Sequence, residues 1–95
     1  MRNAGQFCIT FYTRPGCCLC DNALEVLARL QKEFSLNIEI VDISGIPELE
    51  ARYGALVPVG TRGGEEIFRY HADEESLRQL MVSYRENDED LHARR

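Results

Sequence analysis

Three cysteines crowded into four positions constrain this chain more than any other feature. Cys17, Cys18 and Cys20 stand together, after a stretch typical of a buried strand and at the start of a helical pattern, and the fourth cysteine is Cys8. In secreted domains held by disulfides, the cysteines instead spread along the chain and tie distant loops together. The tight cluster therefore indicates redox chemistry or metal binding.

The elements around this cluster alternate between strand and helix. The expected strands are rich in apolar, aromatic or β-branched residues and span 7–12, 36–42, 56–59 and 66–70. The expected helices span 18–34, 48–53 and a last segment that Asp73 caps. A helix joins the first two strands, so they should be parallel, whereas Gly63-Gly64 predicts an antiparallel hairpin between the last two. The pattern predicts an α/β fold in the order β-α-β-α-β-β-α, with a four-stranded mixed sheet flanked by helices.

The length and charge of the chain restrict its organisation and its class. Ninety-five residues suffice for one domain, which we expect at 1–85, followed by a charged and disordered tail at 86–95. The first residues are polar and no apolar run approaches the roughly 20 residues of a membrane span, so we expect a cytoplasmic protein. A net charge of -5 without a basic stripe argues against nucleic-acid binding.

The spacing of Cys17 and Cys20 suits a redox dithiol. Side chains at i and i+3 share one face of a helix, so the two sulfur atoms can reach bonding distance. The free N–H groups and partial positive charge of a helix N-terminus stabilise a thiolate, which is the nucleophile in disulfide exchange. Cys17 lies at the very end and should attack, Cys20 lies one turn inside and should resolve the mixed disulfide, and Arg14 adds positive charge nearby.

Two other readings of the cysteine cluster remain open. Zinc sites also use a C-x-x-C pair, but zinc normally takes four ligands, and the sequence has no second such pair. A zinc or iron–sulfur module is therefore the first alternative, and an interaction protein that has lost redox activity is the second. Cys18 is either a spectator or a competitor for the disulfide. Cys8 should be a small core residue, because the strand at 7–12 reads as buried on both faces.

The segment from Phe11 to Asp21 resembles the active-site stretch of glutaredoxin-like proteins, which belong to the thioredoxin-fold superfamily. The motif consists of a Thr, a basic residue, two variable positions, Cys, two variable positions, Cys and Asp, and it is matched by Thr13 through Asp21. Further along, Val57-Pro58-Val59 resembles the cis-proline strand of the thioredoxin fold. The resemblance covers roughly residues 7 to 85 and agrees with the element order expected above.

This resemblance implies a thiol–disulfide oxidoreductase with a thioredoxin fold. Cys17 would be the nucleophile, Cys20 the resolving thiol and Pro58 a cis-proline packed beside them. The backbone of Val57 would pair with an extended substrate. The expected partners are protein or small-molecule disulfides. We expect the protein to act on them as a monomer, without a bound cofactor or a metal.

The chain departs from typical glutaredoxins at the glutathione site. Those proteins carry Pro-Tyr between the cysteines, where this chain has Cys18-Leu19, and a Gly-Gly pair followed by Asp before the last helix. Here Asp73 can stand in for the acidic member, but Tyr70 and His71 occupy the region of the glycines. Glycines allow a ligand to approach the backbone without a Cβ in the way. We therefore expect glutathione to bind more weakly here than to an ordinary glutaredoxin.

Overall fold

Seven elements follow one another in the order that the sequence predicts. The computed structural model describes the backbone of residues 7–93 and the side chains of residues 7–84. The elements are β1 (Phe7–Thr13), α1 (Cys18–Glu33), β2 (Leu36–Asp42), α2 (Pro47–Tyr53), β3 (Val59–Arg62), β4 (Glu65–Arg69) and α3 (Glu74–Ala93). Pro47 begins α2 and Gly54 ends it, as expected from the sequence.

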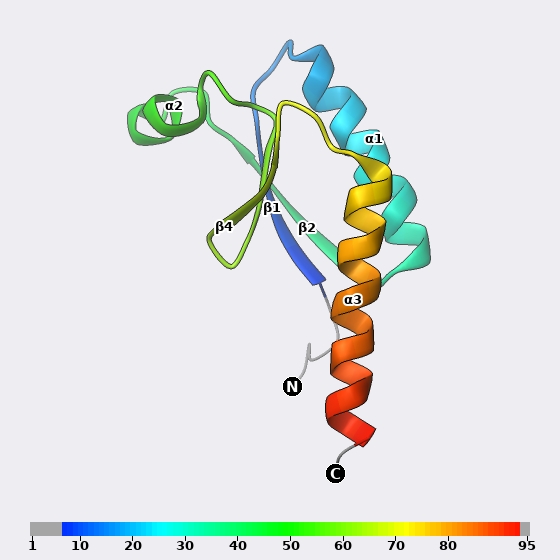
Figure 1. Cartoon of the computed structure of the whole chain (residues 1–95). Helices are drawn as coiled ribbons and strands as arrows, with labels where there is room; N and C mark the ends of the chain where they lie inside the picture. The colour runs from blue at the N-terminus through cyan, green and yellow to red at the C-terminus, as the bar shows by residue number, and fades with distance from the viewer. Residues whose placement is uncertain (1–6, 94–95) are drawn as a thin grey trace.

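The strands form one mixed sheet in the order β2-β1-β3-β4. β1 is parallel to β2, and β3 is antiparallel to both β1 and β4, so the predicted pairing is confirmed. Figure 1 shows α1 and α3 side by side, with α2 apart from them. Ion pairs join the two neighbouring helices, at 3.0 Å between Arg29 and Glu74 and 2.8 Å between Arg78 and Glu33.

The main core lies between the sheet and the pair of helices α1 and α3. Alternate residues of β1 point into it, and Phe7, Ile9 and Phe11 are all buried. The helices supply the buried side chains of Ala23, Leu27, Leu30, Leu77 and Met81. Full burial of one large apolar side chain contributes about 1.5–3 kcal/mol to folding. This layer therefore holds the start of α1, with its cysteines, at a defined place above the sheet.

The opposite face of the sheet is covered only in part. Tyr53 of α2 stacks on Tyr12 with ring centroids 4.2 Å apart, and it packs with Ile43 and Val59 in a second small core. Cys8 lies on this face at the other end of β1 and is exposed. The expectation that Cys8 is a buried core residue is therefore wrong, because α2 packs against the far end of the strand and leaves Cys8 uncovered.

Two boundaries differ from those expected. β3 begins at Val59 rather than at residue 56, because the N–H groups of Leu56 and Val57 donate to the Tyr53 carbonyl in a turn after α2. α3 continues to Ala93, so the boundary expected after residue 85 does not coincide with the end of the helix. Extending a helix by one residue is far easier than starting one, which favours this continuation. Residues 94–95 of the expected tail lie outside the described part of the chain.

The 20 residues of α3 would be long enough to span a bilayer, but acidic and basic residues interrupt them. Within residues 7–93, no helix combines the length and the apolar character that a membrane crossing requires.

Candidate functional site

Cys17 and Cys20 meet at the first turn of α1. Cys17 is the N-cap residue with an extended backbone, and its carbonyl oxygen accepts the N–H groups of Cys20 at 3.1 Å and Asp21 at 3.2 Å. The Cys20 N–H also donates to the Cys17 Sγ at 3.1 Å. The structure joins the two cysteines in a disulfide, with Cα atoms 5.2 Å apart. The pairing expected from the i, i+3 spacing is therefore present.

The two paired cysteines differ in their exposure. Cys17 is partly buried at the edge of the main core, whereas Cys20 is only 3% exposed within it. A reactant can therefore reach Cys17 from solvent, while Cys20 is sheltered from it. This asymmetry is the one that a nucleophile and a resolving thiol require.

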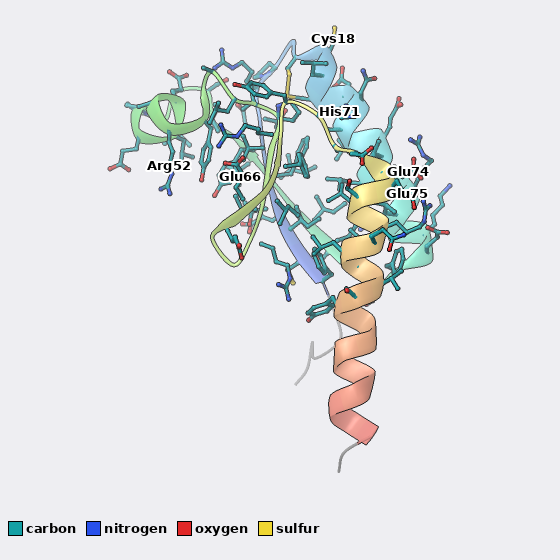
Figure 2. The ribbon with its side chains drawn as sticks, viewed as in Figure 1. Cys18, Arg52, Glu66, His71, Glu74 and Glu75 are labelled. Atoms are coloured by element: carbon teal, nitrogen blue, oxygen red, sulfur yellow. A yellow bond between two sulfur atoms is a disulfide. The ribbon has the colours of Figure 1, made fainter. Side chains whose placement is uncertain are left out.

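The two remaining cysteines are free and exposed. Figure 2 shows Cys18 at the outer end of α1, away from the core. Cys8 lies near the start of β1, whereas the loop to Cys17 follows the end of that strand. Among residues whose side chains are described, no three His, Cys, Asp or Glu side chains gather closely enough to hold a metal ion.

The segment that leads into β3 packs on the same core as the cysteine pair. The Val57–Pro58 peptide bond is cis, as the sequence predicts. Pro58 is buried, and Val57 packs against the same apolar cluster as Cys17. The Val57 N–H donates to the Tyr53 carbonyl at 3.0 Å, so it is already engaged within the chain. If a substrate backbone pairs with Val57, the Val57 carbonyl oxygen must accept the hydrogen bond, and the substrate must donate an N–H group.

Arg14 connects the two loops that carry the site. Its guanidinium donates to the Gly54 carbonyl at the end of α2, at 2.6 Å, rather than to a group beside Cys17. A positive charge at a helix C-terminus is favourable, because the last carbonyl groups carry partial negative charge. Since Gly54 precedes the Val57–Pro58 segment and Arg14 precedes Cys17, this hydrogen bond holds the two halves of the site together.

The loop between β4 and α3 is hydrogen-bonded to the Pro58 segment. The Tyr70 N–H donates to the Pro58 carbonyl at 2.8 Å and to the Leu56 carbonyl at 3.1 Å. Ala72 is 2% exposed and belongs to the main core, which also contains Cys20. Figure 2 shows His71 in the same loop, on the side where α1 begins.

Asp73 is engaged at the start of α3. Its Oδ2 accepts the Ser76 N–H at 3.1 Å and the Ser76 hydroxyl, and its carbonyl accepts the Leu77 N–H, so the predicted cap is confirmed. The hydrogen bonds from the Ser76 hydroxyl and N–H lower the pKa of this carboxyl group below its ordinary value. Asp73 therefore places a negative charge at the start of α3.

Most of the chain matches a known family. Residues 8–81 match the family described as Glutaredoxin-like domain (DUF836). An uncharacterised protein of Mycobacterium tuberculosis is 32% identical over 75 residues, which cover 74% of this chain and 77% of that protein. A glutaredoxin-like protein of Dictyostelium discoideum is 32% identical over 83 residues, which cover 81% of this chain and 77% of that protein.

Solved structures agree with the fold. A structural-genomics target protein from X. campestris has a TM-score of 0.68 at 33% identity, over 79% of this chain and 96% of that one. A mutant thioredoxin from Halobacterium salinarum has a TM-score of 0.57 at 23% identity, over 81% of this chain and 73% of that one. The thioredoxin fold expected from the sequence is therefore confirmed.

Proposed function

This chain belongs to the glutaredoxin-like domain family, and we propose that it is a thiol–disulfide oxidoreductase that cycles Cys17 and Cys20 between a dithiol and a disulfide. The observation that supports this most is the pairing itself, at a helix start, between a partly exposed and a buried cysteine. A cysteine that starts disulfide exchange must be accessible and near positive potential. Cys17 is partly exposed at a helix start and meets both conditions.

The proposed reaction has two steps. The Cys17 thiolate attacks one sulfur of the substrate disulfide, so that a Cys17–substrate bond forms and the other substrate sulfur leaves and takes up a proton. The Cys20 thiolate then attacks the Cys17 Sγ, which forms the internal disulfide and releases the second substrate thiol. Two electrons pass from the protein to the substrate, and an external thiol must return them.

The start of α1 provides the electrostatic support for the first step. The Cys20 N–H, which donates to the Cys17 Sγ in the disulfide form, can also donate to the thiolate in the reduced form. The helix dipole adds a partial positive charge at this terminus. The Asp21 carboxylate in the first turn opposes a second thiolate at Cys20, so that Cys17 ionises in preference.

The proposed substrates are protein or small-molecule disulfides. We propose that the protein reduces them as a monomer without a bound cofactor, in the cytoplasm, where thiols are kept reduced.

Glutathione should bind to this protein more weakly than to an ordinary glutaredoxin. Tyr70 and His71 place exposed side chains where glutaredoxins have glycines. The Ser76 N–H at the start of α3 already donates to Asp73, so it is not free for a carboxylate of the tripeptide.

The proposal is tested by catalysed reduction of insulin with dithiothreitol as the electron donor. We expect the wild type to accelerate the reaction and Cys17→Ser to return it to the uncatalysed rate. Serine is also a good N-cap residue, so α1 should still form. Cys18→Ser is the matched control and should keep most of the activity. Full activity in Cys17→Ser would contradict the proposal. Equal loss of activity in the two variants would show that the assignment of Cys17 as the nucleophile is wrong.

A further inference from the structure

We propose that Arg14 is a positioning residue for disulfide exchange. Its hydrogen bond to the Gly54 carbonyl sets the place of the Val57–Pro58 segment relative to the loop that carries Cys17, and Arg14 acts through this contact rather than through its charge. The inference rests on the proposed function, and it identifies a residue outside the cysteine pair on which the binding of peptide disulfides depends.

The direction of the Arg14 side chain is the first observation. Its Nη2 atom donates to the Gly54 carbonyl oxygen at 2.6 Å, across 40 residues of chain. The side chain is exposed, and salt at about 0.1 M screens an exposed charge within roughly 10 Å. The sulfur of Cys17 has a donor of its own at the start of α1, the N–H of Cys20. The fixed contact of the guanidinium is therefore with α2 and not with the thiol.

The glycine at position 54 is the second observation. Its φ of −53° and ψ of −38° are helical angles that any residue adopts, so backbone freedom does not explain a glycine there. A Cβ atom at this position would lie 3.0 Å from the Arg14 Nη2 and would clash with the Glu50 carbonyl oxygen. The absence of a side chain therefore leaves the room in which the guanidinium reaches the carbonyl.

The turn after Gly54 is the third observation. The carbonyl of the preceding residue, Tyr53, accepts the Val57 N–H at 3.0 Å and so closes the turn. The Tyr53 ring also stacks on Tyr12 of β1, with centroids 4.2 Å apart. The beginning of the turn is thus tied to the end of β1 twice, by this stack and by Arg14. A shift of Gly54 must therefore move Val57, where a substrate backbone would pair.

The other end of the contact is held as firmly. Arg14 directly follows β1, whose last residue, Thr13, accepts the Ile43 N–H at 2.9 Å. The loop then leads to Cys17, which packs on the same core cluster as Val57. The hydrogen bond of Arg14 therefore joins the loop before the nucleophile to the segment that would hold the substrate. Small errors in such an arrangement are costly, because exchange requires the reacting sulfur atoms to be aligned.

The experiment compares a substrate that has a peptide backbone with one that has none. The first is a synthetic peptide with one internal disulfide, and the second is bis(2-hydroxyethyl) disulfide, which cannot pair with Val57. The full chain is used with dithiothreitol as the electron donor. Arg14→Met should lower kcat/KM for the peptide about tenfold, mainly through KM, and should change the small disulfide little. The rate of Cys17 alkylation by iodoacetamide, mapped by mass spectrometry, should keep its pH dependence.

Two further variants separate the contact from the charge. Gly54→Ala keeps the charge of Arg14 but crowds its contact with the carbonyl, so it should also raise KM for the peptide. Combined with Arg14→Met it should add little, because both changes remove the same contact. Lys32→Met, which removes a positive charge from the last turn of α1, is the matched control and should affect neither substrate. Urea midpoints confirm that each variant is folded.

The outcomes distinguish this inference from the proposed function. Equal losses for both substrates in Arg14→Met, with Cys17 alkylation shifted to higher pH, would overturn the inference and show that the charge acts on the thiol. Unchanged kinetics with the peptide in Arg14→Met, or full additivity with Gly54→Ala, would overturn it as well. Failure of the wild type to reduce even the small disulfide would refute the proposed function itself.

Discussion

Two helices of this protein are capped at their N-termini with the same geometry but by different atoms. At the start of α1 the Cys17 Sγ accepts the N–H of Cys20, and at the start of α3 the Asp73 Oδ2 accepts the N–H of Ser76, both at 3.1 Å and both three residues along the chain. Each side chain satisfies a donor that has no partner inside its helix. The carboxylate can only cap, whereas the sulfur can also form and break a bond. One local geometry therefore provides stability in α3 and chemistry in α1.

The residues that donate to the two caps differ as well. Cys20 is buried and carries a second sulfur, whereas Ser76 is exposed and carries a hydroxyl that adds a second hydrogen bond to Asp73. The α1 terminus thus has a reactive partner sheltered from solvent, and the α3 terminus has only another donor. The difference indicates that the pairing of Cys17 with Cys20, and not capping as such, distinguishes the functional terminus.

The largest expected effect comes from making the two caps alike. Cys17→Asp places at α1 the residue that caps α3, and it should abolish disulfide exchange while keeping the helix start, because Asp is as good an N-cap as Ser. Catalysed insulin reduction and the urea unfolding midpoint, compared with the reduced wild type, measure the two properties. Residual catalysis above the uncatalysed rate would show that disulfide exchange does not depend on Cys17, the residue that caps α1.

Removal of the buried partner should have the next largest effect. Cys20→Ser leaves the nucleophile but cannot resolve the mixed disulfide, so the variant should accumulate a covalent Cys17–substrate adduct and turn over far more slowly. Mass spectrometry of the protein after exposure to a peptide disulfide detects the adduct. The same treatment of Cys18→Ser should leave no lasting adduct on Cys17. An adduct on Cys18 in the Cys20→Ser variant would instead identify Cys18 as the attacking thiol.

At α3 the effect should be on stability alone. Asp73→Ala removes the cap and should lower the urea midpoint, whereas Asp73→Asn keeps a good capping side chain and should lower it less. Neither change alters the cysteine pair, so both variants should still form the Cys17–Cys20 disulfide. Equal midpoints for the Ala variant and the wild type would mean that the hydrogen bonds from Ser76 contribute nothing to folding.

The smallest expected effect is the response to acid. Hydrogen bonds from Ser76 lower the pKa of Asp73, and those from Arg29 lower the pKa of Glu74, in the folded protein. Stability from a lowered pKa is fully present above the unfolded value and is lost as the pH falls through the folded one. The urea midpoint should therefore decrease as the pH falls from about 5 towards 3. Asp73→Asn should make this decrease shallower, and an unchanged slope would exclude Asp73 as a contributor.

The local patterns of the sequence predicted the fold and the cysteine pair well. Strand alternation, helical periodicity, Pro47 and Gly54 depend on neighbouring residues, and so does the i, i+3 spacing of Cys17 and Cys20. The sequence also predicts Asp73 as a cap for the same reason. Features of this kind are determined within one or two turns of chain and can be read without knowledge of the tertiary contacts.

The features that the sequence did not predict depend on where distant segments pack. Cys8 is exposed because α2 covers only the far end of β1. Arg14 reaches Gly54, 40 residues away, which no local pattern indicates. The positive φ of Tyr70 accompanies hydrogen bonds to Leu56 and Pro58, so it too follows from tertiary contacts.

Disulfide mapping after mild oxidation tests the central claim most directly. The reduced protein is oxidised, its free thiols are alkylated, and the digested peptides are identified by mass spectrometry, before and after reduction. The expected result is a reversible Cys17–Cys20 bridge, with Cys8 and Cys18 recovered in the alkylated form. A dominant Cys18–Cys20 bridge, or any dominant bridge that contains Cys8, would contradict the assignment of Cys17 and Cys20 as the redox pair.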